Sequence, residues 1–398
     1  MRRPAYMLFI LLLFLVSCTS SNGSPAQPSP TSTSTPPQMQ QTKSPSSTPY
    51  GTSSLPGIQL PQGFQISTYA KGLNTPRFMT IGPGDTLLVA NRGGSSVVAY
   101  PKGATAAQAG NPIVVASDLH DPTSLEMHDG YLYIGEGSSI ARMKLGSDLK
   151  AGPIERIITD LPDGGQHSTR TVLIGPDNHI YVSIGSDCNV CIESDPHRAA
   201  IWIYNMDGSG GHQYAKGLRN AVGMAVNPWT NQIWVNVNGR DLLGDNIPPE
   251  TVYSLVDQGD YGWPRCHAGT IRDPDFGQSA DACNGVQKPL VTMQAHSAPL
   301  GMDFYPQNST QFPMNYRNSL YIAFHGSWNR SVPTGHKIVR VPLQNGKVVG
   351  PAEDFITGWL TSDGNSTGRP TGVTFAPDGT MFVSDDTTGA IYHIWYQS

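Results

Sequence analysis

A unit that recurs six times constrains what this chain can fold into. Each unit reads as an apolar strand, a turn of Pro, Asp, Gly or Asn, a second apolar strand, a polar loop, a third strand and an amphipathic fourth strand. The second strands are predicted at Thr86–Asn91, Tyr131–Glu136, His179–Gly185, Gln232–Asn236, Ser319–Phe324 and Thr380–Asp385. Repeats of about 40–50 residues with four strands each are typical of propeller blades. The sequence therefore predicts an all-β fold, a six-bladed β-propeller.

One predicted strand, Gln65–Leu73, has no earlier blade to belong to. Beside the C-terminal strand Ala390–Trp395 it would complete the last blade and remove two exposed sheet edges. We therefore expect the N-terminal strand to close the ring. An open solenoid is the alternative.

The first residues predict export from the cytoplasm. Arg2 and Arg3 precede the apolar run Ala5–Val16, which is shorter than the about 20 residues of a transmembrane helix. Residues 15–18, Leu-Val-Ser-Cys, resemble a bacterial lipobox. We expect a lipoprotein signal peptide at 1–17, lipidation of Cys18, and anchoring to a bacterial membrane at the cell surface or in the periplasm. Ordinary cleavage near the same place is the alternative.

Composition divides the rest of the chain. Residues 18–55 are mostly Ser, Thr, Pro and Gln, which predicts a disordered tether that begins at the lipidated cysteine. Residues 56–398 are assigned to the propeller. The net charge of −5 offers nothing basic for binding nucleic acid.

Four cysteines lie inside the predicted propeller, and their even number favours disulfides in an oxidising compartment. Their spacing suggests the local pairs Cys188–Cys191 and Cys266–Cys283. Redox or zinc chemistry at the CxxC is the alternative, although no second CxxC accompanies it.

Reactive residue types gather in the loops of one predicted face. In a propeller, the loops between blades share a face with the loops that join second and third strands; the remaining loops here are mainly short turns. The segments on the reactive face are Arg77, 91–92, 164–170, 187–198, 219–220, 238–241, 296–297, 325–330, 368–370 and 385–386. Each of these residues also has a structural interpretation. A lone His or Arg in a loop is usually solvated, Asp385-Asp386 can cap a turn, and Trp263 can pack in the core. Convergence on one rim instead favours a site for a small polyanion and a polar substrate.

These segments resemble a known family, the pyrroloquinoline quinone (PQQ)-dependent sugar dehydrogenases of the soluble glucose dehydrogenase type. Within it, the chain is most similar to the L-sorbosone dehydrogenase branch. The resemblance is carried by GGQHSTRTVLIGPD (164–177), SIGSDCNVC (183–191), GLRNAVGMA (217–225), NGRDLLGDNIPPE (238–250), GDYGWPRC (259–266), HSAPLG (296–301), HGSWNRS (325–331) and GRPTGVTFAPDG (368–379). It covers about the whole of 60–396 and implies the same six-bladed fold.

The resemblance also implies roles for individual residues. His167 stands at the position of the base that takes the hydroxyl proton while hydride passes to PQQ. A Ca²⁺ ion would polarise the cofactor, held partly by the backbone carbonyls of Gly239 and Arg240. The cofactor itself would be bound by residues at matching or neighbouring positions: Gln166, Arg219 (which we also place among the catalytic residues), Asn220 and Arg369.

Several positions depart from the glucose-oxidising members. His325 falls where they carry a lysine on the cofactor, and Thr371 where they carry a second arginine. Ser186 replaces the aspartate that orients the base, with Asp187 one position late. Arg240 replaces a proline, and it or Arg330 is a candidate to supply the missing positive charge at the cofactor. Glucose is therefore a poor default substrate.

The leading hypothesis is a lipid-anchored enzyme that uses PQQ and Ca²⁺ to oxidise an aldose, a sorbosone-like aldehyde or a related polyol. A quinone or cytochrome would accept the electrons. A non-catalytic propeller that binds carbohydrate or protein is the second hypothesis, favoured by the lost lysine and arginine. A Ca²⁺-dependent lactonase-type hydrolase is the third, but it needs carboxylates converging on a central metal.

Overall fold

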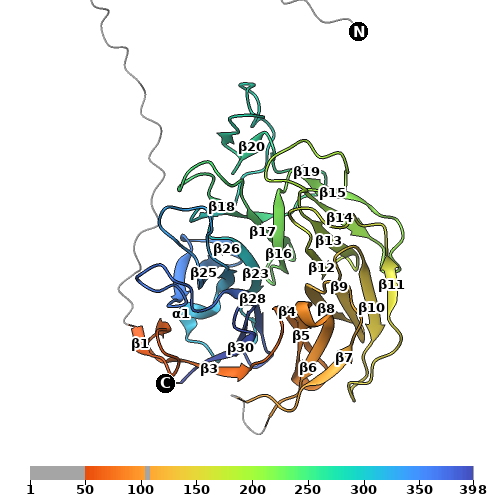
Figure 1. Ribbon diagram of the computed structural model, residues 1–398, viewed down its shortest axis with the longest axis vertical. Coiled ribbons are helices and arrows are strands. Elements are labelled where there is room, and N and C mark those ends of the chain that lie inside the picture. Colours follow the sequence, from red (N-terminus) through yellow and green to blue (C-terminus); the bar gives the residue numbers. More distant parts are fainter. Residues whose placement is uncertain (1–49, 104–107, 398) are drawn as a thin grey trace, which may run out of the picture. The chain divides into compact units, whose positions relative to one another are not determined.

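The computed structural model describes residues 50–103 and 108–397, and within them six sheets radiate as blades from a common centre (Figure 1). The first three blades consist of β4 (Pro76–Gly82), β5 (Thr86–Asn91), β6 (Ser96–Tyr100) and β7 (Ile113–Ala116); β8 (Ser124–His128), β9 (Tyr131–Gly135), β10 (Ile140–Lys144) and β11 (Glu155–Ile158); β12 (Arg170–Ile174), β13 (Ile180–Ile184), β14 (Ala200–Tyr204) and β15 (His212–Lys216). In each blade the first strand lies innermost.

The last three blades repeat this order. They consist of β16 (Asn220–Val226), β17 (Ile233–Asn238), β18 (Glu250–Ser254) and β22 (Val291–Met293); β23 (Pro299–Phe304), β24 (Ser319–Phe324), β25 (Lys337–Gln344) and β27 (Glu353–Ile356), with the short β26 (Lys347–Val348) on β25; β28 (Pro370–Phe375), β29 (Met381–Asp385), β30 (Ala390–Tyr396) and β3 (Phe64–Ala70). The six predicted second strands correspond to β5, β9, β13, β17, β24 and β29, which confirms the six-bladed propeller.

The predicted closure of the ring is confirmed. β3 pairs antiparallel with β30, from Phe64 opposite Tyr396 to Ala70 opposite Ile391. The ring of Phe64 contacts aromatic rings of the fifth blade and its loops, with centroids 4.8 Å from Phe312 and 5.0 Å from Phe355. Burying such a side chain contributes about 1.5–3 kcal/mol, so packing reinforces the strand pairing.

The hydrophobic core lies between neighbouring blades. Leu88 of the first blade and Leu132 of the second belong to one buried cluster, and Trp234 of the fourth and Phe304 of the fifth belong to another. Because each blade buries its faces against its neighbours, the inner strands are fixed relative to one another. Their starting ends can therefore hold side chains in defined positions.

Connections between third and fourth strands were expected to be short turns, but the connection from β18 to β22 is long. Residues 255–290 form a long excursion in which β19 (Gly259–Asp260) pairs in parallel with β15, and β20 (Cys266–His267) pairs with β21 (Ile271–Arg272). Trp263 is buried in this excursion, as expected. Both predicted disulfides, Cys188–Cys191 and Cys266–Cys283, are present.

Strand pairing begins a few residues before the predicted start of the propeller at 56. β1 (Tyr50–Thr52) pairs with β2 (Gln59–Pro61), and the remaining regular elements are a short helix, α1 (Met314–Arg317), and two single-turn 3₁₀ helices, η1 (Pro83–Asp85) and η2 (Arg92–Gly94). The predicted signal peptide, Cys18 and most of the predicted tether lie outside the described residues. None of the helices within 50–103 and 108–397 is long and apolar enough to span a membrane.

Two carboxyl groups face the central channel, where all six inner strands line a cavity of about 250 Å³. Burial raises the pKa of Glu126 to about 8, and the neighbouring charge of Asp303 adds to this effect. Burial also raises the pKa of Asp303 to about 7, although the N–H groups of Phe304 and Phe375 bind its oxygens at 2.8 and 3.0 Å. Both groups favour the protonated form in the folded protein.

We expect Glu126→Gln to raise the free energy of unfolding at pH 9 by about 2 kcal/mol and to leave it nearly unchanged at pH 5. A carboxyl group whose pKa is raised by folding stabilises the folded state at low pH, and this contribution is lost as the pH rises through the folded pKa. Urea unfolding at both pH values measures the effect. Glu155→Gln, at an exposed outer strand, is the control; an equal gain at both pH values would contradict the prediction.

Candidate functional site

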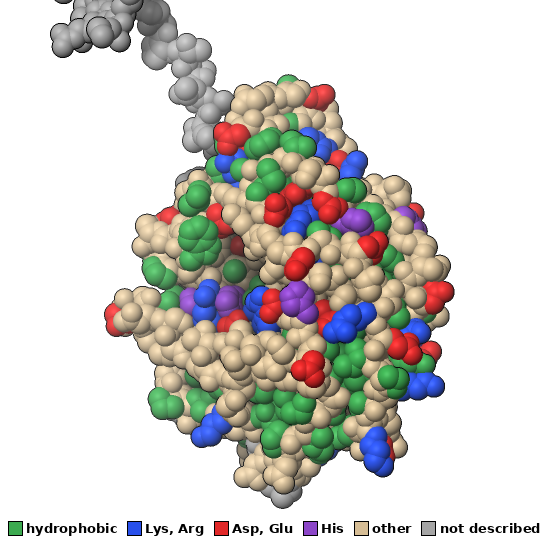
Figure 2. Space-filling model, turned by 45° about the vertical axis from the view of Figure 1, so that its right-hand side comes forward, with side chains coloured by type: hydrophobic (Ala, Val, Ile, Leu, Met, Phe, Trp, Pro, Cys, Tyr) green, Lys and Arg blue, Asp and Glu red, His purple; other side chains and the backbone are tan. Residues whose placement is uncertain are grey.

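The six inner strands all begin at one mouth of the channel, and four of them carry an arginine at that point. Arg77 is the second residue of β4, Arg170 is the first residue of β12, and Arg219 and Arg369 directly precede β16 and β28. Arg170 is fully buried, and its guanidinium donates to the backbone carbonyl oxygens of Pro162, His167 and Thr169. Arg77 and Arg219 are buried, and Arg369 is half-buried. Figure 2 shows one face of the molecule, on which basic, acidic and histidine side chains lie close together around a hollow. This gathering of charge defines the candidate site.

His167 lies between the third blade and the loop that follows β13. Its Nδ1 is 2.8 Å from the carbonyl oxygen of Ser186 and 2.9 Å from the Ser186 hydroxyl. A carbonyl oxygen only accepts hydrogen bonds, so Nδ1 carries the proton and Nε2 keeps its lone pair. Burial lowers the pKa of His167 to about 3, with a further contribution from the charges of Arg219 and Arg198. The ring is therefore neutral near pH 7, with Nε2 able to accept a proton.

Arg219 is held by the loops of two blades. Its Nη2 lies 2.8 Å from Asp241 Oδ2 and 2.9 Å from Asn189 Oδ1, and Nε donates to the Asn189 carbonyl at 2.9 Å. Burial lowers the pKa of Arg219, an effect that Asp241 opposes. Asn220, the next residue, is close to His167, because a Cβ on Gly185 would meet atoms of both side chains. The structure thus brings His167, Arg219 and Asn220 together.

A second network contains His325, Asp386 and Arg77. His325 Nε2 lies 2.9 and 3.0 Å from the two oxygens of Asp386, which also accepts a hydrogen bond from Arg77 Nη1 at 2.8 Å. Burial alone would raise the pKa of Asp386, but the bonds with His325 and Arg77 outweigh it and lower the pKa to about 2. Burial lowers the pKa of His325 despite this partner.

Arg369 differs from Arg77 and Arg219 because, among the described residues, no carboxylate accepts a hydrogen bond from its guanidinium. Its Nε and Nη2 donate to the carbonyl oxygens of His325 and Gly326 at 3.0 and 3.1 Å. Thr371, at the position where a second arginine was noted as missing, is fully buried and donates to the Arg369 carbonyl. The charges of Asp386 and Asp385 act on Arg369, but its guanidinium forms no ion pair within the described part of the chain and can still bind an anion.

A family model described as TrAA12-like matches residues 58–270 and 268–397. The chain belongs to the TrAA12-like family. An uncharacterized protein of Borreliella burgdorferi is 28% identical over 355 residues, which cover 85% of this chain and 91% of that protein. A pyrroloquinoline quinone-dependent pyranose dehydrogenase of Coprinopsis cinerea is 28% identical over 418 residues, covering 86% of this chain but only 56% of that protein.

Solved structures share the fold of this TrAA12-like chain. The holo form of the pyranose dehydrogenase PQQ domain from Coprinopsis cinerea superposes with a TM-score of 0.74 at 24% identity, covering 85% of this chain and 97% of that domain. The calcium structure of Trichoderma reesei family AA12 gives 0.73 at 22% identity, covering 87% and 98%. These findings confirm the predicted resemblance to PQQ-dependent sugar dehydrogenases, whereas the L-sorbosone dehydrogenase branch stays a prediction.

Three predicted cofactor residues of this TrAA12-like chain point elsewhere or lie at the surface. Arg240 forms ion pairs with Asp273 at 2.5 Å and Asp275 at 2.6 Å, both in the 255–290 excursion. Arg330 donates to the carbonyl oxygens of Asp245 and Ala295, and Gln166 is exposed. The guanidinium groups of Arg240 and Arg330 are thus engaged in holding loops, and their predicted role at the cofactor stays a prediction.

The backbone predicted to bind Ca²⁺ is fixed by a buried carboxylate. Glu250 accepts the N–H groups of Gly239 at 2.7 Å and Ala298 at 3.2 Å. Burial raises the pKa of Glu250 to about 8 against these bonds. Within the described residues, the carbonyl oxygens of Gly239 and Arg240 accept no hydrogen bond from the protein. They are oxygen donors of the kind that a hard cation prefers.

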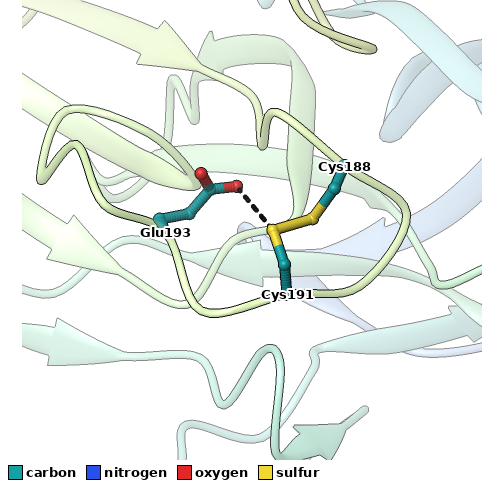
Figure 3. A group of neighbouring side chains, drawn as sticks. All are labelled: Cys188, Cys191 and Glu193. Carbon is teal, nitrogen blue, oxygen red and sulfur yellow. Dashed lines mark hydrogen bonds between the residues drawn. A yellow bond between two sulfur atoms is a disulfide. The ribbon is translucent and has the colours of Figure 1, made fainter. Parts of the chain in front are cut away.

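Figure 3 shows a different group of potential metal ligands, Cys188, Cys191 and Glu193. The two sulfur atoms are joined in a disulfide, and Glu193 Oε1 lies 3.7 Å from the sulfur of Cys191. A disulfide provides no thiolate, so this group is a covalent clip in the oxidised protein. It is the only such group of three among residues 50–103 and 108–397.

Sequence reasoning placed Asp241 and Asp386 on the rim but gave them no role. Their signal was their position in loops between second and third strands: Asp241 lies in the same loop as Arg240, and Asp386 lies in the corresponding loop of the blade after that of His325. Asn189 and Glu250 were missed as supports of the site, because neither residue type nor spacing reveals partners that lie in other loops.

We expect Asp386→Ala to lower the free energy of unfolding by about 3 kcal/mol, because it leaves the buried guanidinium of Arg77 without its counter-ion. Urea unfolding at pH 7 measures the loss. Asp148→Ala, which removes an exposed pair with Lys150, is the matched control and should change stability by less than about 0.5 kcal/mol. Equal effects of the two substitutions would contradict this assignment.

We expect the ring of His167 to remain neutral from pH 8 down to pH 5 in the protein without cofactor. Its pKa is lowered to about 3, so protonation begins only well below the ordinary range. Histidine ring signals followed by NMR during a pH titration measure this, with assignment by the loss of one signal in His167→Gln. A His167 midpoint near 6.5 would show that burial and the neighbouring arginines do not act as described.

Proposed function

We propose that this protein is a PQQ-dependent sugar dehydrogenase. The observation that carries the proposal is the placement, at one channel mouth, of a neutral histidine with a free Nε2 beside arginines from neighbouring inner strands. The pyranose dehydrogenase of Coprinopsis cinerea and a sugar dehydrogenase of Hypocrea jecorina are named as PQQ-dependent, which supports the same cofactor here.

The residues at the mouth fit a quinone cofactor that carries several carboxylates. Arg369 has no hydrogen-bonded carboxylate among the described residues, and guanidinium groups bind carboxylates through paired hydrogen bonds. Several buried polar atoms of the same loops and strand starts have no hydrogen-bond partner in the described structure, among them Arg77 Nε and Ser297 Oγ. A polar ligand would remove the cost of leaving such atoms unpaired.

In this proposal Arg219, Asn220 and Arg369 hold the cofactor and His167 acts as the base. The His167 Nε2 accepts the proton of the substrate hydroxyl, and Ser186 keeps the ring oriented through Nδ1. When bound, PQQ supplies the two-electron acceptor for the hydride that the sugar carbon loses. The balance is one carbonyl product, two electrons and two protons from each alcohol or aldehyde hydrate oxidised.

Ca²⁺ is proposed to sit at the carbonyl oxygens of Gly239 and Arg240, where Glu250 fixes the backbone. A calcium structure is known for a Trichoderma reesei member of family AA12, which supports this choice of ion. Bound there, the ion would act as a Lewis acid toward the cofactor.

The proposed substrate is an aldose, a sorbosone-like aldehyde or a related polyol, and the proposed acceptor is a quinone or cytochrome. We further propose that lipid on Cys18 anchors the enzyme to a bacterial membrane, outside the cytoplasm. Metabolic labelling with a fatty-acid analogue tests the anchor, since Cys18→Ala should abolish the label.

Two other functions are less well supported. A binding propeller without cofactor is favoured by the absence of the lysine and second arginine, but Arg369 and the unpaired Arg77 Nε retain the features of an anion site. A lactonase-type hydrolase would need carboxylates that converge on one metal ion. Among the described residues, the one group of three close ligands is the cysteine-containing clip.

We expect His167→Ala to lower kcat by at least about 100-fold while the Kd for PQQ changes by less than about threefold, because the ring moves a proton and does not carry the cofactor's counter-charge. PQQ is titrated into apoprotein with Ca²⁺ by following quinone absorbance, and its bleaching by a panel of sugars is then timed. The control His212→Ala removes a histidine exposed on an outer strand. Saturable PQQ binding without bleaching by any sugar would favour the binding propeller, and no binding would reject the proposal.

A further inference from the structure

We propose that Asn189, presented by the Cys188–Cys191 disulfide, is the positioning residue that sets the guanidinium of Arg219, and that reduction of this disulfide weakens the cofactor site. The expected effect on PQQ binding rests on the proposed function, whereas the positioning of Arg219 by Asn189 does not depend on it.

Asn189 contacts both partners of the Arg219–Asp241 ion pair. Its carbonyl oxygen accepts Arg219 Nε at 2.9 Å, and its Oδ1 accepts Arg219 Nη2 at 2.9 Å. The same Oδ1 accepts the Asp241 N–H at 2.8 Å, while Nδ2 donates to the Asp241 carbonyl at 3.2 Å. One asparagine therefore joins the β13–β14 loop, the start of β16 and the β17–β18 loop.

The disulfide holds this asparagine in place. Cys188 and Cys191 bracket Asn189 and Val190 in a covalent ring, so the backbone carbonyl and side chain of Asn189 keep a fixed direction. The ring is also tied at its base, because the Glu193 carboxylate accepts the N–H of Asp187 at 2.8 Å. Without the covalent link, these four residues would gain conformational freedom at the cost of the contacts to Arg219.

The same clip reaches the proposed base. Ser186 Oγ donates to the Cys188 carbonyl at 2.7 Å, and Ser186 orients His167 through both its hydroxyl and its carbonyl. The Ser186 N–H in turn donates to the Arg219 carbonyl at 2.7 Å. Loosening the clip therefore disturbs Arg219 and His167 together.

The two disulfides differ in their access to a reductant. Cys188 and Cys191 are both half-buried, whereas in the second disulfide Cys266 is buried and only Cys283 is half-buried. A dithiol such as dithiothreitol attacks one sulfur of the Cys188–Cys191 disulfide and then closes to its own cyclic disulfide. Two electrons and two protons pass to the protein, leaving two thiols.

The first test is Asn189→Ala, with Asn205→Ala as the matched control in a turn whose side chain bonds only to Ser209. We expect Asn189→Ala to raise the Kd for PQQ at least tenfold and the control to leave it within twofold. Hydrogen exchange of the apoproteins should become faster at residues 186–193 and 217–220 in Asn189→Ala alone. Near-UV circular dichroism establishes that each variant is folded.

The second test uses the folded wild-type protein and so does not depend on a variant. The protein is treated mildly with dithiothreitol, and alkylation followed by mass spectrometry shows that only Cys188 and Cys191 are reduced. We expect the reduced protein to show the higher Kd for PQQ and the faster hydrogen exchange of Asn189→Ala. Reoxidation should reverse both changes. Unchanged PQQ affinity in both Asn189→Ala and the reduced protein would overturn the inference. If the wild type binds no PQQ, the proposed function fails instead, and the exchange rates alone decide whether Asn189 positions Arg219.

Discussion

The antiparallel pairing of β3 with β30 is the interaction on which the rest of the structure depends. It joins the two ends of the described propeller, so that the sixth blade has four strands like the others and β30 is not left as its outer edge. A closed ring fixes the spacing of its six inner strands. The convergence of Arg77, Arg219 and Arg369 on one mouth is a consequence of closure, because these residues are far apart in sequence and share only their place at the start of an inner strand.

The mouth must balance the cost of burying several charges. Asp386 offsets the charge of Arg77, and Asp241 offsets that of Arg219. Such pairs hold the arginines in place without leaving much net charge. Among the described residues, the guanidinium of Arg369 donates only to carbonyl oxygens, although the charges of Asp386 and Asp385 also act on it. Arg77 and Arg219 are thus in ion pairs and Arg369 is not, which leaves its guanidinium able to bind an anionic ligand.

The blades were predictable from the repeating pattern of apolar strands and turn residues, because local sequence determines where each strand ends and each turn begins. Closure followed from the one strand left over. The site was predictable at Arg219 and His167, which lie in loops whose face the topology fixes. The partners of Arg240 were not, because Asp273 and Asp275 lie in an excursion that leaves the blade pattern. Asn189 was equally hidden, since its contacts are 30 and 52 residues away in the chain.

In the proposed mechanism, the base His167 is oriented by Ser186 and not by a carboxylate. A carboxylate beside Nδ1 would stabilise the imidazolium that forms when Nε2 takes a proton. Ser186 supplies only neutral oxygens, and the charges of Arg219 and Arg198 further disfavour the protonated ring. An anionic ligand at the mouth would offset these arginines and raise the pKa of His167 toward the range in which a base is effective. In the proposed mechanism, anion binding by the arginines and the basicity of His167 are therefore coupled, and we expect His167 to accept a proton more readily once the mouth is occupied.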